Sequence, residues 1–216
     1  GRAILYPMYA PQRRDERHPE WVQQLAESWT SIEITDLSSE EQRGFFLEGT
    51  GSLVFDPMAP VAYMARSVRS NEELAVKVAE QLNVERVVFD AQDARGQAIY
   101  HTNVIMGVGF AMAMGCWDSI VNEEHRKRII TTLTTNQRPV LELIHTQMNA
   151  FAGNWIELQG SEGPLFAASS TAWNVLSDQQ RSKIERLYTP VIADIPHIEK
   201  FGGGSVRCMI CTVDHG

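Results

Sequence analysis

Cysteine is scarce in this sequence. Three cysteines, Cys116, Cys208 and Cys211, occur among 216 residues, and a small, odd number of thiols is not typical of a disulfide framework. The first residues, GRAILYPMYAPQRR, also lack the charged-then-apolar order of a secretory signal peptide. We therefore expect a reducing, cytoplasmic location.

Long apolar runs and clusters of basic residues are missing as well. The longest apolar stretch, residues 104–117, contains three glycines and is shorter than the roughly 20 residues of a membrane-spanning helix. The formal net charge is −8 and the pI is near 5.3, and no run of Lys and Arg offers the basic surface usual in nucleic-acid binding. These features argue against membrane and nucleic-acid partners. They favour a globular protein with a small, cationic substrate.

Strand-like and helix-like segments alternate along the chain. Trp21, Leu25 and Trp29 recur every four residues and predict one helix, and residues 123–135 predict another that ends before Pro139. Alternating or β-branched segments predict strands. The predicted strands cover residues 3–9, 31–37, 52–56, 61–66, 85–91, 100–115 (as a pair of central strands), 140–144, 155–159, 190–195 and 208–213.

Two capping boxes predict where further helices begin. They are Ser70-x-x-Glu73 and Ser177-x-x-Gln180, each followed by a helix-like segment. No linker or low-complexity segment divides the chain, and the recurring strand-strand-helix unit indicates a repeated module. The fold class predicted is α/β, in one domain that covers residues 1–216.

The stretch EKFGGGSVRCMICTV allows three interpretations. A phosphate-binding loop is disfavoured because the glycines lead into a strand-like segment and no Gly-Lys-Ser/Thr follows. A redox or metal pair of Cys208 and Cys211 is disfavoured because residues three apart on a strand face opposite sides, and no further metal ligands are at hand. A nucleophilic Cys208 remains, beside the alternative that each cysteine is a small core residue, which Cys116 and Cys211 fit.

Candidate partners for a nucleophile lie far upstream. In YHTNV, His101 and Asn103 would share one face of a strand and could enter a single site. In FFLEGTGSLVF, Glu48 is a carboxylate within a predicted apolar strand flanked by glycines, and burial there is costly unless a partner such as a histidine is present. A structural hydrogen bond is the alternative for each of these side chains.

Five segments together resemble the guanidino-group-modifying, or pentein, superfamily. They are LYPMYAPQRRDER, FLEGTGSLVFD, YHTNV, FAGNWIEL and GGGSVRCM, which follow the order of the family across nearly the whole chain. They are most similar to the arginine-deiminase-related branch, with its citrulline-utilisation hydrolases and amidinotransferase-like proteins. The resemblance implies an α/β propeller of five ββαβ modules, of which this chain would lack the N-terminal part.

The resemblance also implies roles for individual residues. Cys208 would attack the central carbon of a guanidino or ureido group, His101 would act as general acid and base, and Glu48 would orient His101. Arg69 would hold the α-carboxylate of an amino-acid substrate, and Gly203 would belong to the turn that presents Cys208 to the substrate. No metal or organic cofactor is expected.

One departure from the family bears on the substrate. Arginine deiminases carry an aspartate two residues after the histidine, and this position is Asn103 here. A neutral amide suits a ureido group, so citrulline is favoured over arginine. An amidinotransferase is the alternative enzyme. A binding or scaffold protein, like the ribosome anti-association factors of this fold, is the alternative without catalysis, and association into a homo-oligomer stays open.

Overall fold

The computed structural model describes residues 1–28 and 32–212. Trp29 of the predicted helix face, the first residue of the predicted strand 31–37 and the last residue of the predicted strand 208–213 lie outside the described residues. The other predicted elements can be compared directly with the structure.

One module is repeated three times. In the first repeat, β3 (Leu53–Phe55) pairs antiparallel with β4 (Val61–Ala65), and β4 pairs parallel with β5 (Glu85–Phe89). The same order of one antiparallel and one parallel pair recurs in two further sheets. Their strands are β6 (Met106–Val108), β7 (Ala113–Gly115) and β8 (Val140–Glu142), and then β9 (Ile156–Gly160), β10 (Gly163–Ser169) and β11 (Thr189–Ala193).

Helices make the crossover that each parallel pair requires. They are α4 (Glu72–Leu82) in the first module, α6 (Glu123–Thr134) in the second, and α8 (Ser170–Asn174) with α9 (Asp178–Glu185) in the third. A fourth sheet contains β1 (Arg2–Leu5) parallel to β2 (Glu33–Asp36), joined through α1 (Pro11–Arg14) and α2 (Pro19–Ser28). The described chain thus contains three ββαβ modules and a parallel β-α-β unit.

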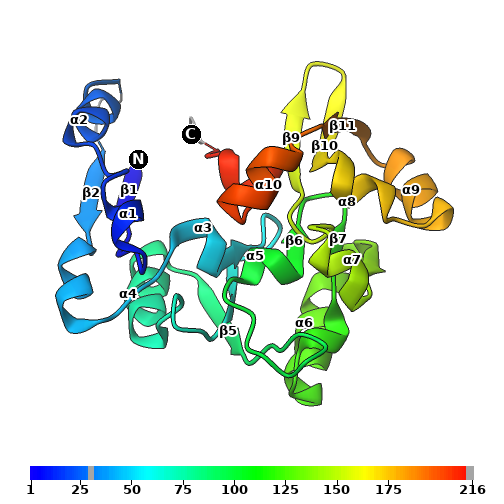
Figure 1. Cartoon of the computed structure of the whole chain (residues 1–216), viewed down its shortest axis with the longest axis horizontal. Coiled ribbons are helices and arrows are strands. Elements are labelled where there is room, and N and C mark those ends of the chain that lie inside the picture. The colour runs from blue at the N-terminus through cyan, green and yellow to red at the C-terminus, as the bar shows by residue number, and fades with distance from the viewer. Residues whose placement is uncertain (29–31, 213–216) are drawn as a thin grey trace.

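The four sheets lie along an arc. Figure 1 shows the sheet of β1 and β2 at one end of the arc, that of β9–β11 at the other, and α10 (Pro196–Gly202) inside the opening between them. The remaining short elements include the one-turn helices α3 (Gly49–Ser52) and α5 (Thr102–Ile105), α7 (His145–Asn149), and the 3-10 helices η1 (Ser38–Arg43), η2 (Trp117–Ser119), η3 (Thr135–Gln137) and η4 (Val206–Met209). Several of these short elements lie on the inner side of the arc, where the pocket described below is found.

Side-chain caps explain where two of the crossover helices begin. The capping box at Ser177 is confirmed, because Ser177 Oγ accepts from Gln180 N at 3.2 Å and Gln180 Oε1 accepts from Ser177 N at 2.9 Å. The prediction of a cap at Ser70 is wrong by one residue. Asn71 is the N-cap of α4, and its Oδ1 accepts from the backbone N of Leu74 at 3.1 Å.

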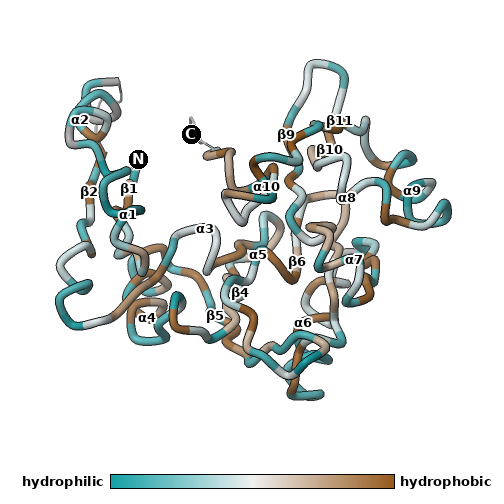
Figure 2. Tube along the Cα trace, viewed as in Figure 1, coloured by the Kyte–Doolittle hydropathy of each residue, from teal (hydrophilic) through white to brown (hydrophobic). Residues whose placement is uncertain are grey.

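The core lies along the strands and between the modules. Every residue of β4 is buried, and Figure 2 shows hydrophilic chain along α1 at the outer end of the arc. A buried ion pair joins two modules, since Arg138 Nη1 donates to Asp56 Oδ1 at 2.7 Å and to the Gly109 carbonyl at 3.1 Å. Among the described residues, no helix has the length and apolar character needed to span a bilayer.

The structure corrects the strand assigned to residues 100–115. Its first part is the one-turn helix α5, for which His101 is the N-cap residue, and only β6 and β7 follow as strands. Short apolar segments do not distinguish a buried helical turn from a buried strand. His101 and Asn103 therefore do not share a strand face, although both reach the same pocket. Glu48 likewise is the residue before α3 and not part of a strand.

The predicted strand over residues 208–213 is also wrong. Cys208 lies in η4, where Cys208 N bonds to Ser205 O at 3.0 Å and Ile210 N bonds to Arg207 O at 3.2 Å, and no described residue after it forms a strand. The argument that Cys208 and Cys211 diverge across a strand thus does not apply. Cys211 is exposed, contrary to the core position expected for it, whereas Cys116 is buried as expected.

Candidate active site

A pocket of about 470 Å³ opens on the inner side of the arc. All six residues that the sequence indicated are among those that line it. They are Glu48, Arg69, His101, Asn103, Gly203 and Cys208. The structure therefore brings together side chains from both ends of the chain, and their individual contacts decide what the pocket can do.

Glu48 and His101 form a close pair at one side of the pocket. Nε2 of His101 lies 2.6 Å from Oε2 of Glu48, and the backbone N–H of Tyr9 donates to Oε1 of Glu48 at 2.9 Å. Burial opposes ionisation of Glu48, but these two hydrogen bonds and the charges of His101 and Arg69 hold the pKa of Glu48 below its ordinary value. Glu48 is 8% exposed, so its carboxylate is a fixed negative charge behind the imidazole.

Two adjacent one-turn helices hold this pair in place. The backbone N of Glu48 donates to the Ser52 hydroxyl at 2.9 Å, which ties the carboxylate residue to α3. The Thr102 hydroxyl of α5 donates to the Ser52 carbonyl, so α3 and α5 are joined directly. A Cβ at Gly51 would lie 2.9 Å from both Cε1 and Nδ1 of His101. Only glycine at this position lets the imidazole pack against α3.

The sulfur of Cys208 lies between two asparagine amides. Nδ2 of Asn154 is 3.2 Å from Sγ, Nδ2 of Asn103 is 3.6 Å from Sγ, and Sγ is 3.5 Å from Oδ1 of Asn154. Both asparagines are 2% exposed. Nδ2 of Asn154 also donates to the Asn103 carbonyl at 3.3 Å. Two N–H groups therefore point at the sulfur and fix its position in the pocket.

The triple glycine delivers Cys208 to this position. Helix α10 ends at Gly202, and Gly203 follows with φ +69°, the left-handed conformation that glycine adopts without strain. A Cβ at Gly204 would lie 3.0 Å from Cβ and 3.1 Å from Sγ of Cys208. The buried Ser205 hydroxyl donates to Glu199 at 2.7 Å. This bond fastens the turn to α10 just before the cysteine.

Arg69 lies across the pocket wall between two tyrosines. Its guanidinium carbon is 5.5 Å from the ring centre of Tyr9 and 5.0 Å from that of Tyr100, and its Nη1 is 3.6 Å from Oε2 of Glu48. The Tyr100 hydroxyl donates to the Gly203 carbonyl at 3.0 Å. Arg69 thus faces the pocket as predicted. Its guanidinium, however, already has contacts with Glu48 and two aromatic rings.

Sequence reasoning missed Asn154, Tyr9 and Tyr100 as site residues. Asn154 is part of the segment FAGNWIEL, which supported the family resemblance, but its side chain was not singled out. Its signal is a polar residue directly before the buried strand β9. Among the described residues, no group of three or more His, Cys, Asp or Glu is placed to hold a metal ion.

Solved structures similar to this chain have the same fold. ArgZ, an arginine dihydrolase from the ornithine-ammonia cycle in cyanobacteria, aligns with a TM-score of 0.73 at 16% identity, over 96% of this chain and 30% of that chain. Its N-terminal domain bound to substrate aligns with a TM-score of 0.70 at 17% identity, over 95% and 68% of the two chains. DDAH from Pseudomonas aeruginosa, in complex with citrulline, aligns with a TM-score of 0.57 at 14% identity, over 94% and 67%.

This chain covers 30% of the length of the whole ArgZ protein. A comparison with curated protein sequences found no match. A family model described as N,N dimethylarginine dimethylhydrolase, eukaryotic, matches residues 1–214. The resemblance to the pentein superfamily and the predicted module of the fold are confirmed. Because the match covers nearly the whole sequence, this chain belongs to the N,N-dimethylarginine dimethylhydrolase family of guanidino-group-modifying pentein proteins.

Proposed function

We propose that this chain is a hydrolase that cleaves a C–N bond of a guanidino or ureido group in an arginine- or citrulline-like amino acid, through a covalent bond to Cys208. One observation carries the proposal. The Cys208 sulfur faces the same pocket as the His101–Glu48 pair and is held by the amides of Asn154 and Asn103. A thiol, a proton carrier and a fixed carboxylate are the parts that two-step hydrolysis requires.

In the first step, the thiolate of Cys208 attacks the central carbon of the guanidinium group. A C–S bond forms, the C–N bond to the leaving amine breaks, and His101 gives a proton to that amine. In the second step, His101 takes a proton from water, and the resulting hydroxide adds to the same carbon. The C–S bond then breaks, which restores the thiolate and leaves a ureido product when the substrate is a guanidino compound.

Glu48 decides which nitrogen of His101 carries out these transfers. Oε2 of Glu48 accepts from Nε2 of His101, so Nδ1 is the nitrogen that exchanges the proton. The Cε1–Nδ1 edge of the ring packs closely against Gly51, where no side chain stands in its way. The carboxylate of Glu48 thus fixes the orientation of the ring that gives the proton to the leaving amine.

The family and the side chain of Asn103 support two candidate substrates. Membership of the dimethylarginine dimethylhydrolase family favours a methylated arginine, with citrulline and dimethylamine as products. Oδ1 of Asn103 is buried and has no hydrogen-bond partner among the described residues, so it is an available acceptor beside the sulfur. As a neutral amide it also fits a ureido group, which keeps citrulline as a second candidate substrate.

The test compares the purified protein on dimethylarginine, arginine and citrulline. We expect kcat/KM to be highest for dimethylarginine, with release of dimethylamine, and a mass increase on Cys208 in reactions stopped before completion. Faster turnover of citrulline would assign it as the substrate instead. If arginine is the fastest, both proposals for the substrate are wrong.

The same experiment separates the alternative functions. A product that carries the amidino group on an added amine would identify an amidinotransferase. Absence of turnover, together with alkylation of Cys208 that neither substrate nor His101→Ala affects, would identify a binding protein.

A free thiol at the centre of the site also supports a reducing location such as the cytoplasm.

A further inference from the structure

A second cavity lies behind the sulfur of Cys208. It has a volume of about 280 Å³ and is lined by Thr50, Ile156 and residues 207–212. Thr50 and Cys208 line both this cavity and the larger pocket. The second cavity therefore adjoins the reacting atom, although none of the roles described above uses it.

Arg207 is the charged residue of this cavity. Among the described residues, none forms a hydrogen bond, ion pair or ring contact with its side chain, and its Nε atom is buried without a partner. Burial lowers the pKa of Arg207 from its ordinary value. Arg207 is half-buried, and a guanidinium that is partly withdrawn from water with a buried, unpaired Nε–H carries a desolvation cost next to the thiol.

Backbone hydrogen bonds hold the main chain of Arg207 beside the sulfur. Its N–H contacts the Asn154 carbonyl at 3.4 Å, and its carbonyl accepts from Ile210 N at 3.2 Å within η4. Ile156, Met209 and Ile210 make part of the cavity lining apolar. No described carboxylate lines the cavity, and the Cys208 sulfur is the group whose charge acts on Arg207. Attraction of Arg207 to an anion is stronger beside an apolar wall than in bulk water.

We propose that the second cavity is an anion subsite in which Arg207 binds a carboxylate or a similar small oxyanion beside the Cys208 sulfur. A guanidinium group matches a carboxylate in shape and can donate two parallel hydrogen bonds to it. Two sources supply such a group, namely the substrate's own α-carboxylate and a separate small acid. The first source rests on the proposed function, whereas the subsite itself does not.

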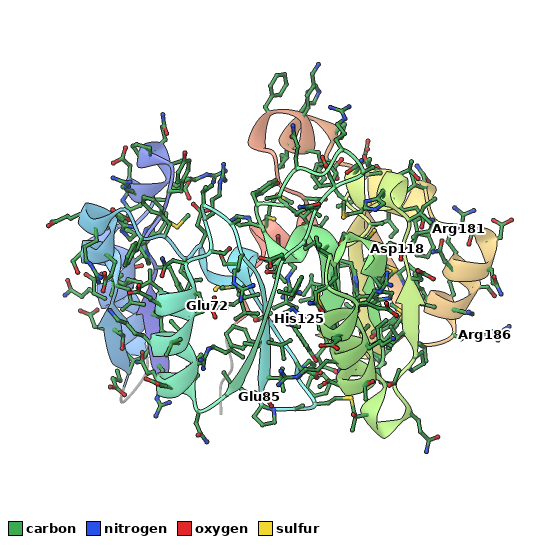
Figure 3. All side chains as sticks on the ribbon, turned by 90° about the horizontal axis from the view of Figure 1, so that it is seen from below. Glu72, Glu85, Asp118, His125, Arg181 and Arg186 are labelled. Atoms are coloured by element: carbon green, nitrogen blue, oxygen red, sulfur yellow. The ribbon has the colours of Figure 1, made fainter. Side chains whose placement is uncertain are left out.

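Alkylation of Cys208 tests the subsite without any enzymatic turnover. Iodoacetate and iodoacetamide form the same C–S bond with release of iodide, but only iodoacetate carries a carboxylate. Mass spectrometry of the peptide that contains Cys208 gives the second-order rate constant for each reagent, in a Cys211→Ser background. The ratio of the two rate constants is the quantity compared. We compare the wild type, Arg207→Met and Arg207→Lys, with Arg186→Met as the matched control for lost charge. Arg186 is exposed at the end of α9 and lines neither cavity (Figure 3).

We expect Arg207→Met to lower the iodoacetate-to-iodoacetamide ratio about five- to tenfold. Arg207→Lys should keep most of the ratio, and Arg186→Met should leave it unchanged. Thermal unfolding shows which variants are folded. If Cys211→Ser does not fold, the rates are measured on the chain with Cys211 intact, from the peptide that carries Cys208 alone. If Arg207→Met slows both reagents equally, Arg207 acts only on the thiolate and the anion subsite is disproved. An unchanged ratio also disproves it.

A second arm identifies the source of the anion. Dimethylarginine and its methyl ester are compared as substrates of the wild type and Arg207→Met. If Arg207 holds the α-carboxylate, the preference for the acid over the ester should fall about tenfold in the variant. A preserved preference, together with slower alkylation of Cys208 in acetate, would assign the subsite to a separate acid. If no guanidino compound is hydrolysed but the alkylation ratio still depends on Arg207, the proposed function fails and the subsite stands.

Discussion

Nε2 of His101 lies 2.6 Å from Oε2 of Glu48, although 53 positions separate these residues in the chain. The contact joins α3 to α5, and it places a buried carboxylate behind an imidazole at the edge of a pocket. Much of what the site can do depends on this pair, and its charge can be tested through stability as well as through activity.

We expect Glu48 to make stability depend on pH. Its pKa in the folded chain is lowered, because the hydrogen bonds from His101 and Tyr9, with the charges of His101 and Arg69, outweigh the opposing effect of burial. Such a carboxylate stabilises the fold above the pKa of the unfolded chain, and this contribution is lost as the pH falls through that value toward the lower folded one. The free energy of unfolding should therefore be higher for the wild type than for Glu48→Gln at pH 7. This difference should be smaller at about pH 3.5.

Urea unfolding at both pH values measures this difference. The matched control is Glu185→Gln, which removes one negative charge at an exposed residue of α9. Its free energy of unfolding should differ from that of the wild type by the same amount at both pH values. A Glu48→Gln difference that grows on acidification would contradict the assignment of Glu48 as a stabilised carboxylate.

Gly51→Ala should displace the imidazole while leaving the fold intact. The new Cβ would lie 2.9 Å from two ring atoms of His101. A shift of about 1 Å at a reacting group lowers turnover about 100-fold. We therefore expect a fall of that order in kcat with little change in the melting temperature. The same substitution in a His101→Ala background should have no further effect, since the ring is gone, and an equal additional loss there would show that Gly51 acts by another route.

Asn154→Asp should slow the alkylation of Cys208. The side chain of residue 154 contacts the sulfur at 3.2 Å, and a carboxylate in place of the amide would repel a thiolate and donate no N–H to it. We expect the iodoacetamide rate at Cys208 to fall at least about tenfold. Asn154→Ala removes the donor without adding a charge, so its rate should lie between those of the wild type and Asn154→Asp. Equal rates in all three proteins would mean that Asn154 does not orient the thiol.

Arg138→Met should destabilise the protein strongly. The guanidinium of Arg138 is buried, donates to both oxygens of the buried Asp56, and also bonds to carbonyls at Leu133 and Gly109. Removing one member of a buried pair leaves the other as an uncompensated charge, which costs about 3–5 kcal/mol. Urea denaturation measures this cost. Asp56→Leu combined with Arg138→Met should cost less than the sum of the single changes, and strict additivity would show that the two charges do not interact.

Much of the fold could be predicted from the sequence because its patterns are local. The hairpin of β3 and β4, the strand β5 and the cap at Ser177 follow from alternation and from spacing within a few residues. Strand β10 was missed because Pro164 and several small residues hide its alternation. The turns α3, α5 and η4 were read as strands because an apolar segment of four or five residues has no period that separates the two structures.

The site could be predicted only in part, for a similar reason. Glu48, His101 and Cys208 were found because polar side chains within apolar motifs are conspicuous and because the motifs resemble a known family. Asn154 was not singled out, since its importance depends on a contact with Cys208 across 54 positions. The unpaired Nε–H of Arg207 is visible only once its surroundings are known.

The order of the modules has one last consequence. The pocket draws on α3 from one module, α5 from the next, Asn154 ahead of β9 and the turn after α10, and its residues extend from position 8 to position 208. Contacts between such distant parts of the chain form late because a long loop must close first. A reactive thiol with an imidazole across the pocket is thus a signature of completed folding. Any fragment that ends before α10 would be chemically silent however well its own sheets form.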